Sequence, residues 1–259
     1  MQFLNHINFT TEEETIQLIK NSLQKNKVTH LRQIPGTINK RSYFEKLADS
    51  IGNYYDVSED LDSGQIQNGR WVDITFDTRF PDRYRSSKTR FHLHTDASYY
   101  PIDNNMQYFY CEAMVAVGGA TTFIDTRTLV DLLILDDRRE LLERLRTIDV
   151  CFSKFDRKKT RPILIQEGDD WRINFNYNRI DADNTEEAKK TALDFFDFLE
   201  NRVEEAGVTT ALKLQPGEAV FFNDEKILHG RNAFFANESG ERKLIKGTIL
   251  DWQEKEVLV

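Results

Sequence analysis

Apolar positions along the chain follow two different periods, which separate the expected helices from the expected strands. Apolar residues recur every three to four positions over about 12–23, 41–51 and 184–206, and this predicts three amphipathic helices. Shorter helices are expected at 127–133 and 138–145. Thr11 with Glu14, and Asn184 with Glu187, have capping-box spacing and are expected to start the first and the longest helix.

Runs rich in β-branched and aromatic residues fill most of the remaining chain. They predict one or two strands from the apolar residues at 54–55 and 71–76, and further strands near 28–34, 91–96, 107–116, 118–125, 147–155, 161–166, 171–180, 210–214, 219–222 and 242–252. Many strands with a few flanking helices predict a mainly β fold, an antiparallel jelly roll in which distant segments become neighbours. The chain has no repeat, low-complexity tract or linker, so we expect one domain over 1–259, with an N-terminal helical and strand part at 1–90 and a jelly-roll core at 91–252.

Charge and composition narrow the class of partner. The 43 acidic residues outnumber the 35 basic ones, and the net charge of -8 disfavours nucleic acid or an anionic membrane as a partner. No apolar run approaches the roughly 20 residues of a membrane span, and residues 1–6 lack the pattern of a signal peptide. Cys111 and Cys151 are expected to be free thiols in a reducing compartment. These features predict a cytoplasmic protein whose partner is a small molecule.

Candidate metal ligands stand in the 91–96 segment and near the end of the chain. If this segment is a strand, His94 and Asp96 point to the same face, and His229 supplies a third ligand from far downstream. Two His and one carboxylate with open coordination positions form the facial triad of non-haem Fe(II) oxygenases. His-x-Asp alone occurs often by chance, so the surrounding residues decide its meaning.

His92 offers a different metal set. His92 and His94 form the His-x-His pattern that begins a cupin-type site, but that site needs a Glu a few residues later. The chain has Ser98, Tyr99 and Tyr100 there. We therefore expect His92 to be a structural neighbour of the ligands.

Two further positions suit an anionic co-substrate. Thr121 follows His94 by 27 residues, just after Gly118 and Gly119, and Arg242 follows His229 by 13 residues. An Arg on the last strand can bind a carboxylate through two parallel hydrogen bonds, and a hydroxyl can add a third.

With these residues together, the chain resembles the taurine/2-oxoglutarate dioxygenase family, which comprises Fe(II)- and 2-oxoglutarate-dependent oxygenases of the double-stranded β-helix fold. The likeness runs from about residue 91 to 251, is most specific at 216–222 and 229–234, and is greatest to the clavaminate synthase and carbapenem synthase group. It implies Fe(II), 2-oxoglutarate and O2 as cofactor and co-substrates. The roles it implies are iron binding by His94, Asp96 and His229, binding of the 2-oxoglutarate C5 carboxylate by Thr121 and Arg242, and contact with a substrate carboxylate or sulfonate by Arg231 and Lys246.

The chain departs from the family pattern at two places. Relatives commonly carry Asp-Asn-Arg before the last His, where this chain has Asn223, Asp224 and Glu225. We expect local turn contacts to differ there, with Glu225 able to alter the mouth of the substrate site. Lys246 stands where Arg is more usual. Asp96 is retained, whereas halogenating relatives have a small residue, so the likeness favours hydroxylation, desaturation or ring closure.

Two classes of function follow. The first is an oxygenase that oxidises a small anionic or amino-acid-like metabolite in specialised metabolism, such as antibiotic biosynthesis. The second is a non-catalytic β-sandwich binding protein that keeps the oxygenase fold. The complete set of His94, Asp96, His229 and Arg242 favours the first, because a binding protein does not need all four.

Other polar and aromatic segments have open interpretations. In 172–179 polar and apolar residues alternate, so one face of the expected strand is either solvated or lines a site. Tyr99 and Tyr100 either belong to a loop over the substrate or pack internally. The basic segment 157–161 is expected to be a solvated loop rather than an anion-binding patch.

Overall fold

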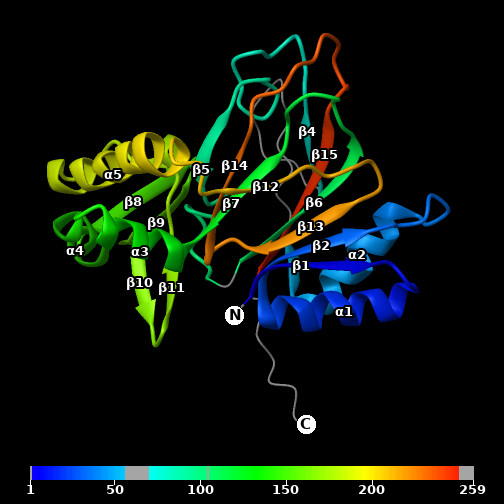
Figure 1. The fold of residues 1–259 in the computed structure, drawn as a ribbon, viewed down its shortest axis with the longest axis horizontal. Coiled ribbons are helices and arrows are strands. Elements are labelled where there is room, and N and C mark those ends of the chain that lie inside the picture. The colour runs from blue at the N-terminus through cyan, green and yellow to red at the C-terminus, as the bar shows by residue number, and fades with distance from the viewer. Residues whose placement is uncertain (1, 56–69, 104, 251–259) are drawn as a thin grey trace.

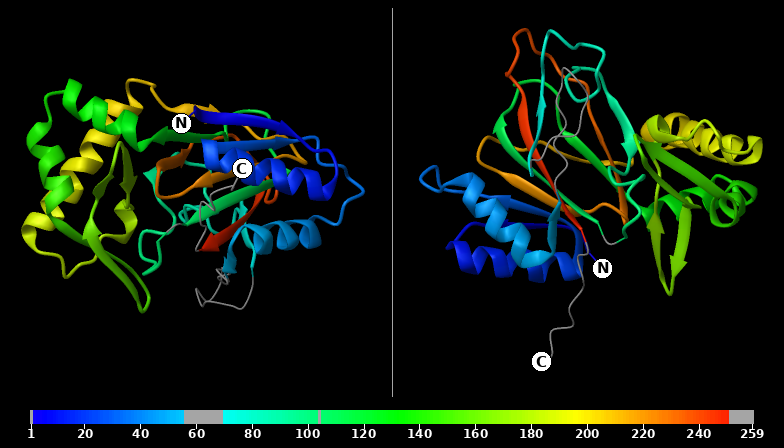
Figure 2. Two further views of the ribbon diagram at one scale, coloured as in Figure 1. Left: turned by 90° about the horizontal axis from the view of Figure 1, so that it is seen from below. Right: turned by 180° about the vertical axis from the view of Figure 1, so that it is seen from behind.

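Two sheets whose strands are mostly antiparallel form the centre of the molecule, and helices cover its two ends (Figure 1). The computed structural model describes residues 2–55, 70–103 and 105–250. Views from below and from behind keep the N-terminal helices and the later helices on opposite sides of the central sheets (Figure 2). Within the described residues no helix is both long and apolar enough to cross a membrane.

The larger sheet has seven strands, and its middle strands carry one wall of the site. Its order is β1 (Gln2–Asn8), β2 (Asn26–Arg32), β13 (Ala219–Asn223), β6 (Met106–Ala113), β15 (Lys243–Leu250) and β3 (Asn53–Tyr55), with β4 (Val72–Thr75) also paired to β15. Only β1 and β2 are parallel among these pairs. Helices α1 (Glu12–Lys25) and α2 (Lys40–Ile51) pack near this sheet, where the ring of Phe44 stacks on Tyr108 at 5.1 Å.

The smaller sheet faces the larger one and carries the opposite wall. Its order is β12 (Thr210–Leu212), β7 (Thr121–Asp125), β14 (Ile227–Arg231) and β5 (Phe91–His94), all antiparallel. Side chains from both sheets, among them Phe109, Phe123 and Phe222, form one apolar cluster between them. Two sheets packed face to face confirm the expected jelly roll and mainly β class.

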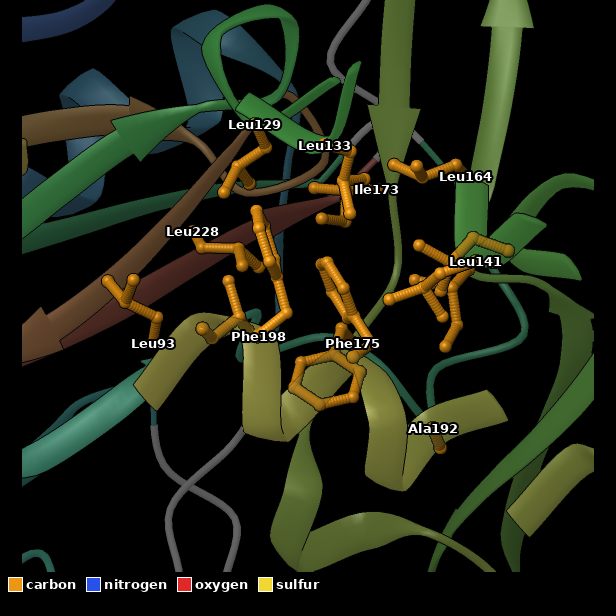
Figure 3. Close-up of a cluster of buried hydrophobic side chains, with 14 of the residues drawn as sticks. Leu93, Leu129, Leu133, Leu141, Leu164, Ile173, Phe175, Ala192, Phe198 and Leu228 are labelled. Atoms are coloured by element: carbon orange, nitrogen blue, oxygen red, sulfur yellow. The ribbon is translucent and has the colours of Figure 1, made fainter. Parts of the chain in front are cut away.

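A second apolar cluster lies on the far side of the smaller sheet, where a helical segment packs (Figure 3). Leu93 of β5 and Leu228 of β14 join this cluster from the sheet, and Phe175 and Phe198 lie beside them. The elements of the segment are α3 (Thr126–Leu135), α4 (Arg139–Thr147), β8 (Asp149–Lys154), β9 (Arg157–Pro162), β10 (Leu164–Glu167), β11 (Asp170–Ile173) and α5 (Glu186–Phe198), which continues as a π-helix over Leu199–Glu204. This packing holds β5 and β14, the strands with the candidate ligands, from behind.

Several local predictions are confirmed. The hydroxyl of Thr11 accepts the backbone N–H of Glu14 at 3.3 Å, so Thr11 caps the first helix as expected, and the same hydroxyl donates to the Glu14 carboxylate at 3.2 Å. The helices expected at 41–51, 127–133 and 138–145 and the strands at 28–34, 107–116 and 219–222 are present with shifts of a few residues at their ends. Cys111 and Cys151 are both free thiols. The last expected strand is present as β15, and its expected end at 251–252 lies outside the described residues.

Other local predictions are wrong, and polar side chains explain why. The strand expected at 171–180 ends at Ile173, because the amides of Asn174 and Asn176 donate to the carbonyls of Ser98 and Thr95 instead of continuing a sheet face. The next residues form a short 3-10 helix, Tyr177–Arg179.

Three further predictions are corrected by the structure, two of them in the segment 126–204. Asn184 does not cap the longest helix, because its amide is bonded to the backbone of Cys151, and Thr185 accepts the N–H of Ala188 as the cap. The basic segment 157–161 is part of strand β9, in which Lys159 and Arg161 are buried, and not a solvated loop. Strand β1 was not expected from the sequence pattern.

Candidate metal centre and cavity

Three candidate ligands converge where the smaller sheet opens toward the larger one. His94 ends β5 and pairs in register with His229 of β14, and their rings lie 4.3 Å apart between centroids. Because β5 ends at His94, Asp96 lies in the following turn and not on the strand face that we expected. Its Oδ1 is 3.7 Å from His94 Nε2, and its Oδ2 is 3.5 Å from His229 Nε2. The ligand atoms of all three lie within 4.8 Å of one another.

The imidazoles are oriented for metal binding. Nδ1 of His94 lies 2.9 Å from the carbonyl oxygen of His92, and because a carbonyl only accepts, this nitrogen carries the proton. Its Nε2 lone pair then faces Asp96. Burial, followed by the neighbouring His94, lowers the pKa of His229 well below its usual value, so this ring is neutral. Two imidazoles and one carboxylate are a donor set that fits Fe(II).

Asp224 fixes the turn that carries Asp96. Its side chain is fully buried, and its carboxylate accepts the backbone N–H of Asp96 at 3.1 Å and of Ala97 at 2.7 Å. Its Oδ1 also lies 3.7 Å from Nδ1 of His229, a buried nitrogen with no hydrogen-bond partner among the described residues. Burial and the nearby Asp96 carboxylate raise the pKa of Asp224 to about 7. The sequence marked Asp224 only as a departure from the family pattern, not as a support of the ligands.

A cation lies against the carboxylate of Asp96, one of the three candidate ligands. Nζ of Lys246, on β15, lies 2.7 Å from Oδ2 of Asp96. Burial acts to raise the pKa of Asp96, but the positive charge of the adjacent Lys246 ammonium holds this pKa well below its usual value. Asp96 is therefore ionised, as a metal ligand must be.

A cavity of about 160 Å³ opens over these residues. Its walls come from both sheets and from the segments at 84–85, 154 and 176–179. It brings together every site residue expected from the sequence: His94, Asp96, Thr121, His229, Arg231, Arg242 and Lys246. Tyr99 also lines it, whereas Tyr100 is buried.

Two buried arginines form one end of the cavity. Arg242 is 2% exposed, and among the described residues its Nε and Nη2 form hydrogen bonds only with the carbonyl oxygen of Gly119, at 3.4 and 3.3 Å. Arg231 donates from Nη2 to the Thr89 carbonyl at 2.8 Å and to Ser87 Oγ at 3.2 Å. Both guanidinium carbons lie 5.4 Å from the centre of the Phe234 ring.

This end of the cavity has an excess of positive charge. Burial lowers the pKa of Arg242 to about 10, and burial together with Arg242 lowers that of Arg231 to about 9, so both stay charged at neutral pH. Within the described part of the chain, no carboxylate forms an ion pair with either one. Buried cations are normally paired, so this end is built for an anion. Thr121, the register partner of Arg231, lies beside them.

Aromatic rings and three further basic side chains, Arg85, Lys154 and Arg179, also line the cavity. Nη2 of Arg179 donates to the hydroxyl of Tyr84 at 2.7 Å, and its guanidinium carbon lies 5.9 Å from the ring centres of both Tyr84 and Tyr99. The Tyr84 ring stacks on Phe91 at 4.9 Å. Arg179 therefore presents a half-buried positive charge held between two tyrosines.

Two neighbours of the expected ligands lie outside this arrangement. The imidazole of His92 contacts Asn178 at 3.0 Å, and His92 is not part of the ligand cluster. Glu225 does not line the cavity mouth. It is buried in an ion-pair network with Arg172 at 2.6 Å and Lys159 at 3.6 Å, which corrects the expectation that it alters the substrate site.

A jelly roll that holds two His and one carboxylate beside an open cavity has the arrangement of a non-haem iron oxygenase. The chain matches the family described as "Taurine catabolism dioxygenase TauD, TfdA family" over residues 4–248, and it belongs to this family. It is an Fe(II)- and 2-oxoglutarate-dependent dioxygenase, with O2 as the second co-substrate. No curated protein sequence matches the chain.

Solved structures share the fold at low sequence identity. PvcB from Pseudomonas aeruginosa superposes with a TM-score of 0.65 at 15% identity, covering 96% of this chain and 86% of that one. An asparagine oxygenase in complex with Fe(II), 2S,3S-3-hydroxyasparagine and succinate gives 0.70 at 12% identity, with 92% and 78% covered. The non-haem iron oxygenase OrfP, in complex with Fe, succinate and (3S)-hydroxy-L-Arg, gives 0.61 at 14% identity, with 93% and 80% covered. These similarities confirm the double-stranded β-helix fold.

Proposed function

We propose that this dioxygenase oxidises a small amino-acid-like metabolite with an anionic group, and that His94, Asp96 and His229 hold its iron. The observation that carries the proposal is the convergence of the ligand atoms of these three side chains within 4.8 Å beside a cavity. The same cavity contains two buried arginines with which no carboxylate among the described residues forms an ion pair. When bound, the iron and 2-oxoglutarate supply the activation of dioxygen. The residues of this chain orient the reactants and exclude water.

Arg242 and Thr121 are assigned to the C5 carboxylate of 2-oxoglutarate. Arg242 has a rigid, planar set of N–H donors. Among the described residues it forms two hydrogen bonds, both long and both to the carbonyl oxygen of Gly119. A carboxylate in this place satisfies the fork and neutralises the buried charge. Arg231, already bonded to Ser87 and Thr89, is assigned to raising the positive potential there rather than to direct substrate contact.

The substrate class is inferred from the neighbours and from the cavity. The solved asparagine oxygenase and OrfP structures hold hydroxylated amino acids, which makes an amino-acid-like substrate the first choice for this chain. Arg179 is suited to the anionic group of such a substrate, because it lines the cavity and contacts Tyr84 and Tyr99, and no carboxylate among the described residues forms an ion pair with it. Hydroxylation, desaturation or ring closure fits the retained Asp96. A place in specialised metabolism such as antibiotic biosynthesis is part of this proposal.

An anaerobic titration tests the proposed iron site. Wild-type protein with Fe(II) and 2-oxoglutarate is expected to show a metal-to-ligand charge-transfer band, and His94→Ala is expected to lose it while remaining folded by circular dichroism. His6→Ala is a matched control, because His6 contacts His30 far from the cavity. A folded wild-type protein without the band would contradict the proposed iron site and favour a non-catalytic binding protein of the same fold.

Succinate formation with a panel of L-amino acids and their carboxylated derivatives then tests the substrate class. The true substrate is expected to raise the rate above the uncoupled rate without substrate. A panel in which amines without a carboxylate stimulate and carboxylates do not would contradict the anionic class.

A further inference from the structure

We propose that Lys246 is a positioning residue for the carboxylate of Asp96, rather than the contact for the anionic group of the substrate. This inference rests on the proposed iron site. It starts from the 2.7 Å ion pair between Lys246 Nζ and Asp96 Oδ2, in which both side chains are largely buried. The family likeness predicts a substrate-binding cation at this position, so the two roles lead to different experiments.

Asp96 needs an external support because it lies beyond the end of a strand. His94 and His229 are fixed by the β5–β14 ladder, whereas Asp96 follows β5 in a turn. Asp224 holds the backbone of that turn through two N–H groups, but those bonds leave the side-chain torsions of Asp96 free. Lys246 Nζ is the nearest of the three nitrogen atoms around the Asp96 carboxylate, since the two imidazole nitrogens lie at 3.5 and 3.7 Å.

Lys246 is well placed to give that support. It lies within β15 of the larger sheet and is in register with Phe109 of β6 on one side and Val72 of β4 on the other. Its ion pair therefore spans the gap between the two sheets and ties the loose ligand to the wall opposite the two imidazoles. Among the described residues, Asp96 is the one carboxylate with which Lys246 forms an ion pair.

The chemistry of a carboxylate allows both partners. It has two oxygens and about four lone-pair sites, so one oxygen can bind a metal while the other accepts an N–H from Lys246. Lys suits this task because its ammonium is a compact charge with three donors, while the longer planar fork of Arg is suited to a ligand carboxylate. With Lys in place of the more usual Arg, this position thus forms an ion pair with Asp96 and does not extend toward the substrate. Arg179 then remains as the cation for the substrate.

Two effects of the ammonium on iron oppose each other. Its charge repels a divalent cation and lowers the basicity of Asp96, while its bond holds Asp96 in the ligating orientation. The proposal requires that orientation dominates. Removal of partners of this kind typically costs 10–100-fold in metal affinity.

The test needs no substrate. Anaerobic Fe(II) titrations in the presence of 2-oxoglutarate, read from the charge-transfer band, compare wild type with Lys246→Met and Lys246→Gln. We expect Lys246→Met to bind Fe(II) about 10–100-fold more weakly and with an altered band. Lys246→Gln keeps a donor without the charge and is expected to recover most of the affinity. Lys243→Met, on the same strand but paired to Glu112 outside the cavity, is the matched control and should match wild type.

The outcomes separate the possible roles. Lys246→Met with wild-type or tighter iron binding and an unchanged band would overturn the inference. If that variant also loses amino-acid-stimulated succinate formation, Lys246 is the substrate contact instead. A wild-type protein without any band would overturn the proposed iron site itself, and this inference with it. Thermal melts by circular dichroism show whether each variant is folded, and Lys246→Ala, which also removes the donor and is expected to weaken Fe(II) binding to the same extent, replaces Lys246→Met if that variant does not fold.

Discussion

The backbone N–H of Ala97 donates to Oδ2 of Asp224 at 2.7 Å, a bond that joins segments 127 residues apart in the sequence. Together with the bond from Asp96 N–H to Oδ1, it ties the turn after β5 to the turn between β13 and β14. The two turns carry one candidate ligand and precede another, His229. One buried carboxylate therefore holds both halves of the candidate iron site.

Loss of this carboxylate is expected to damage both stability and iron binding. Asp224→Ala leaves two buried N–H groups without an acceptor, each of which costs about 1–3 kcal/mol of unfolding free energy. It also frees the turn of Asp96, and we expect about 10–100-fold weaker Fe(II) binding. Urea unfolding and anaerobic iron titration measure the two effects. Asp131→Ala, at an exposed position of α3, is the control. A folded Asp224→Ala with wild-type iron affinity would show that the turn does not depend on Asp224.

Arg242 is expected to control the affinity for 2-oxoglutarate and not that for iron. Charge-assisted hydrogen bonds contribute about 1.5–3 kcal/mol, so Arg242→Met should weaken 2-oxoglutarate binding about 10–100-fold. Calorimetric titration of Fe(II) without 2-oxoglutarate should be unchanged, because Arg242 contacts none of the three ligands. Equal 2-oxoglutarate affinity in wild type and variant would mean that the anchor lies elsewhere.

The sequence predicted the candidate site best at positions where few residue types can bind the expected ligand. The spacing of His94, Asp96, Thr121, His229 and Arg242 predicted a set of side chains that line one cavity, because a metal and a dianion demand few and specific donors. The jelly roll followed from the alternation of strands and turns.

What the sequence did not reveal are contacts that depend on tertiary structure. In the sequence, Asp224 looks like an ordinary turn residue, and only the fold places its carboxylate where it accepts the backbone N–H of Asp96. Asn174 and Asn176 look like a strand face, but their amides bond to the ligand turn and end the strand at Ile173. Lys159 looks solvated in a basic run, and burial against Asp103 is invisible from its neighbours. In each case a polar side chain contacts a residue that is distant in the sequence, and the local pattern of polar and apolar residues does not predict such a contact.

Arg179 provides a test of the substrate side of the cavity. Arg179→Met is expected to leave Fe(II) and 2-oxoglutarate binding intact, because Arg179 contacts none of the residues assigned to them. The concentration of a stimulating amino acid needed for half-maximal succinate formation should rise at least about tenfold, the effect of one charge-assisted bond. Lys189→Met on the surface of α5 serves as the control. An unchanged concentration dependence would remove Arg179 from the substrate site.

Asp103 is expected to make stability depend on acid pH. It accepts hydrogen bonds from Lys159 at 2.6 Å and Arg161 at 2.8 Å and pairs with Arg172 at 3.0 Å. Burial acts to raise its pKa, but these cations outweigh burial and lower the pKa to about 2. As pH falls, the unfolded chain therefore takes up a proton near its usual pKa of about 3.9, before the folded protein does. The stabilisation is complete above that pKa and is lost as pH falls toward 2.

Asp103→Asn removes this contribution. Because the side chain is nearly half exposed, we expect a modest loss of about 1–2 kcal/mol of unfolding free energy at pH 7. Between pH 4 and 2 the difference from wild type should shrink, since wild type loses the same interaction there. Urea unfolding across pH 2–7 measures it, with Asp183→Asn as control because Asp183 is highly exposed and its one ion pair, with Lys158, is 3.7 Å long. A constant difference between wild type and Asp103→Asn at every pH would show that the charge of Asp103 does not carry the effect.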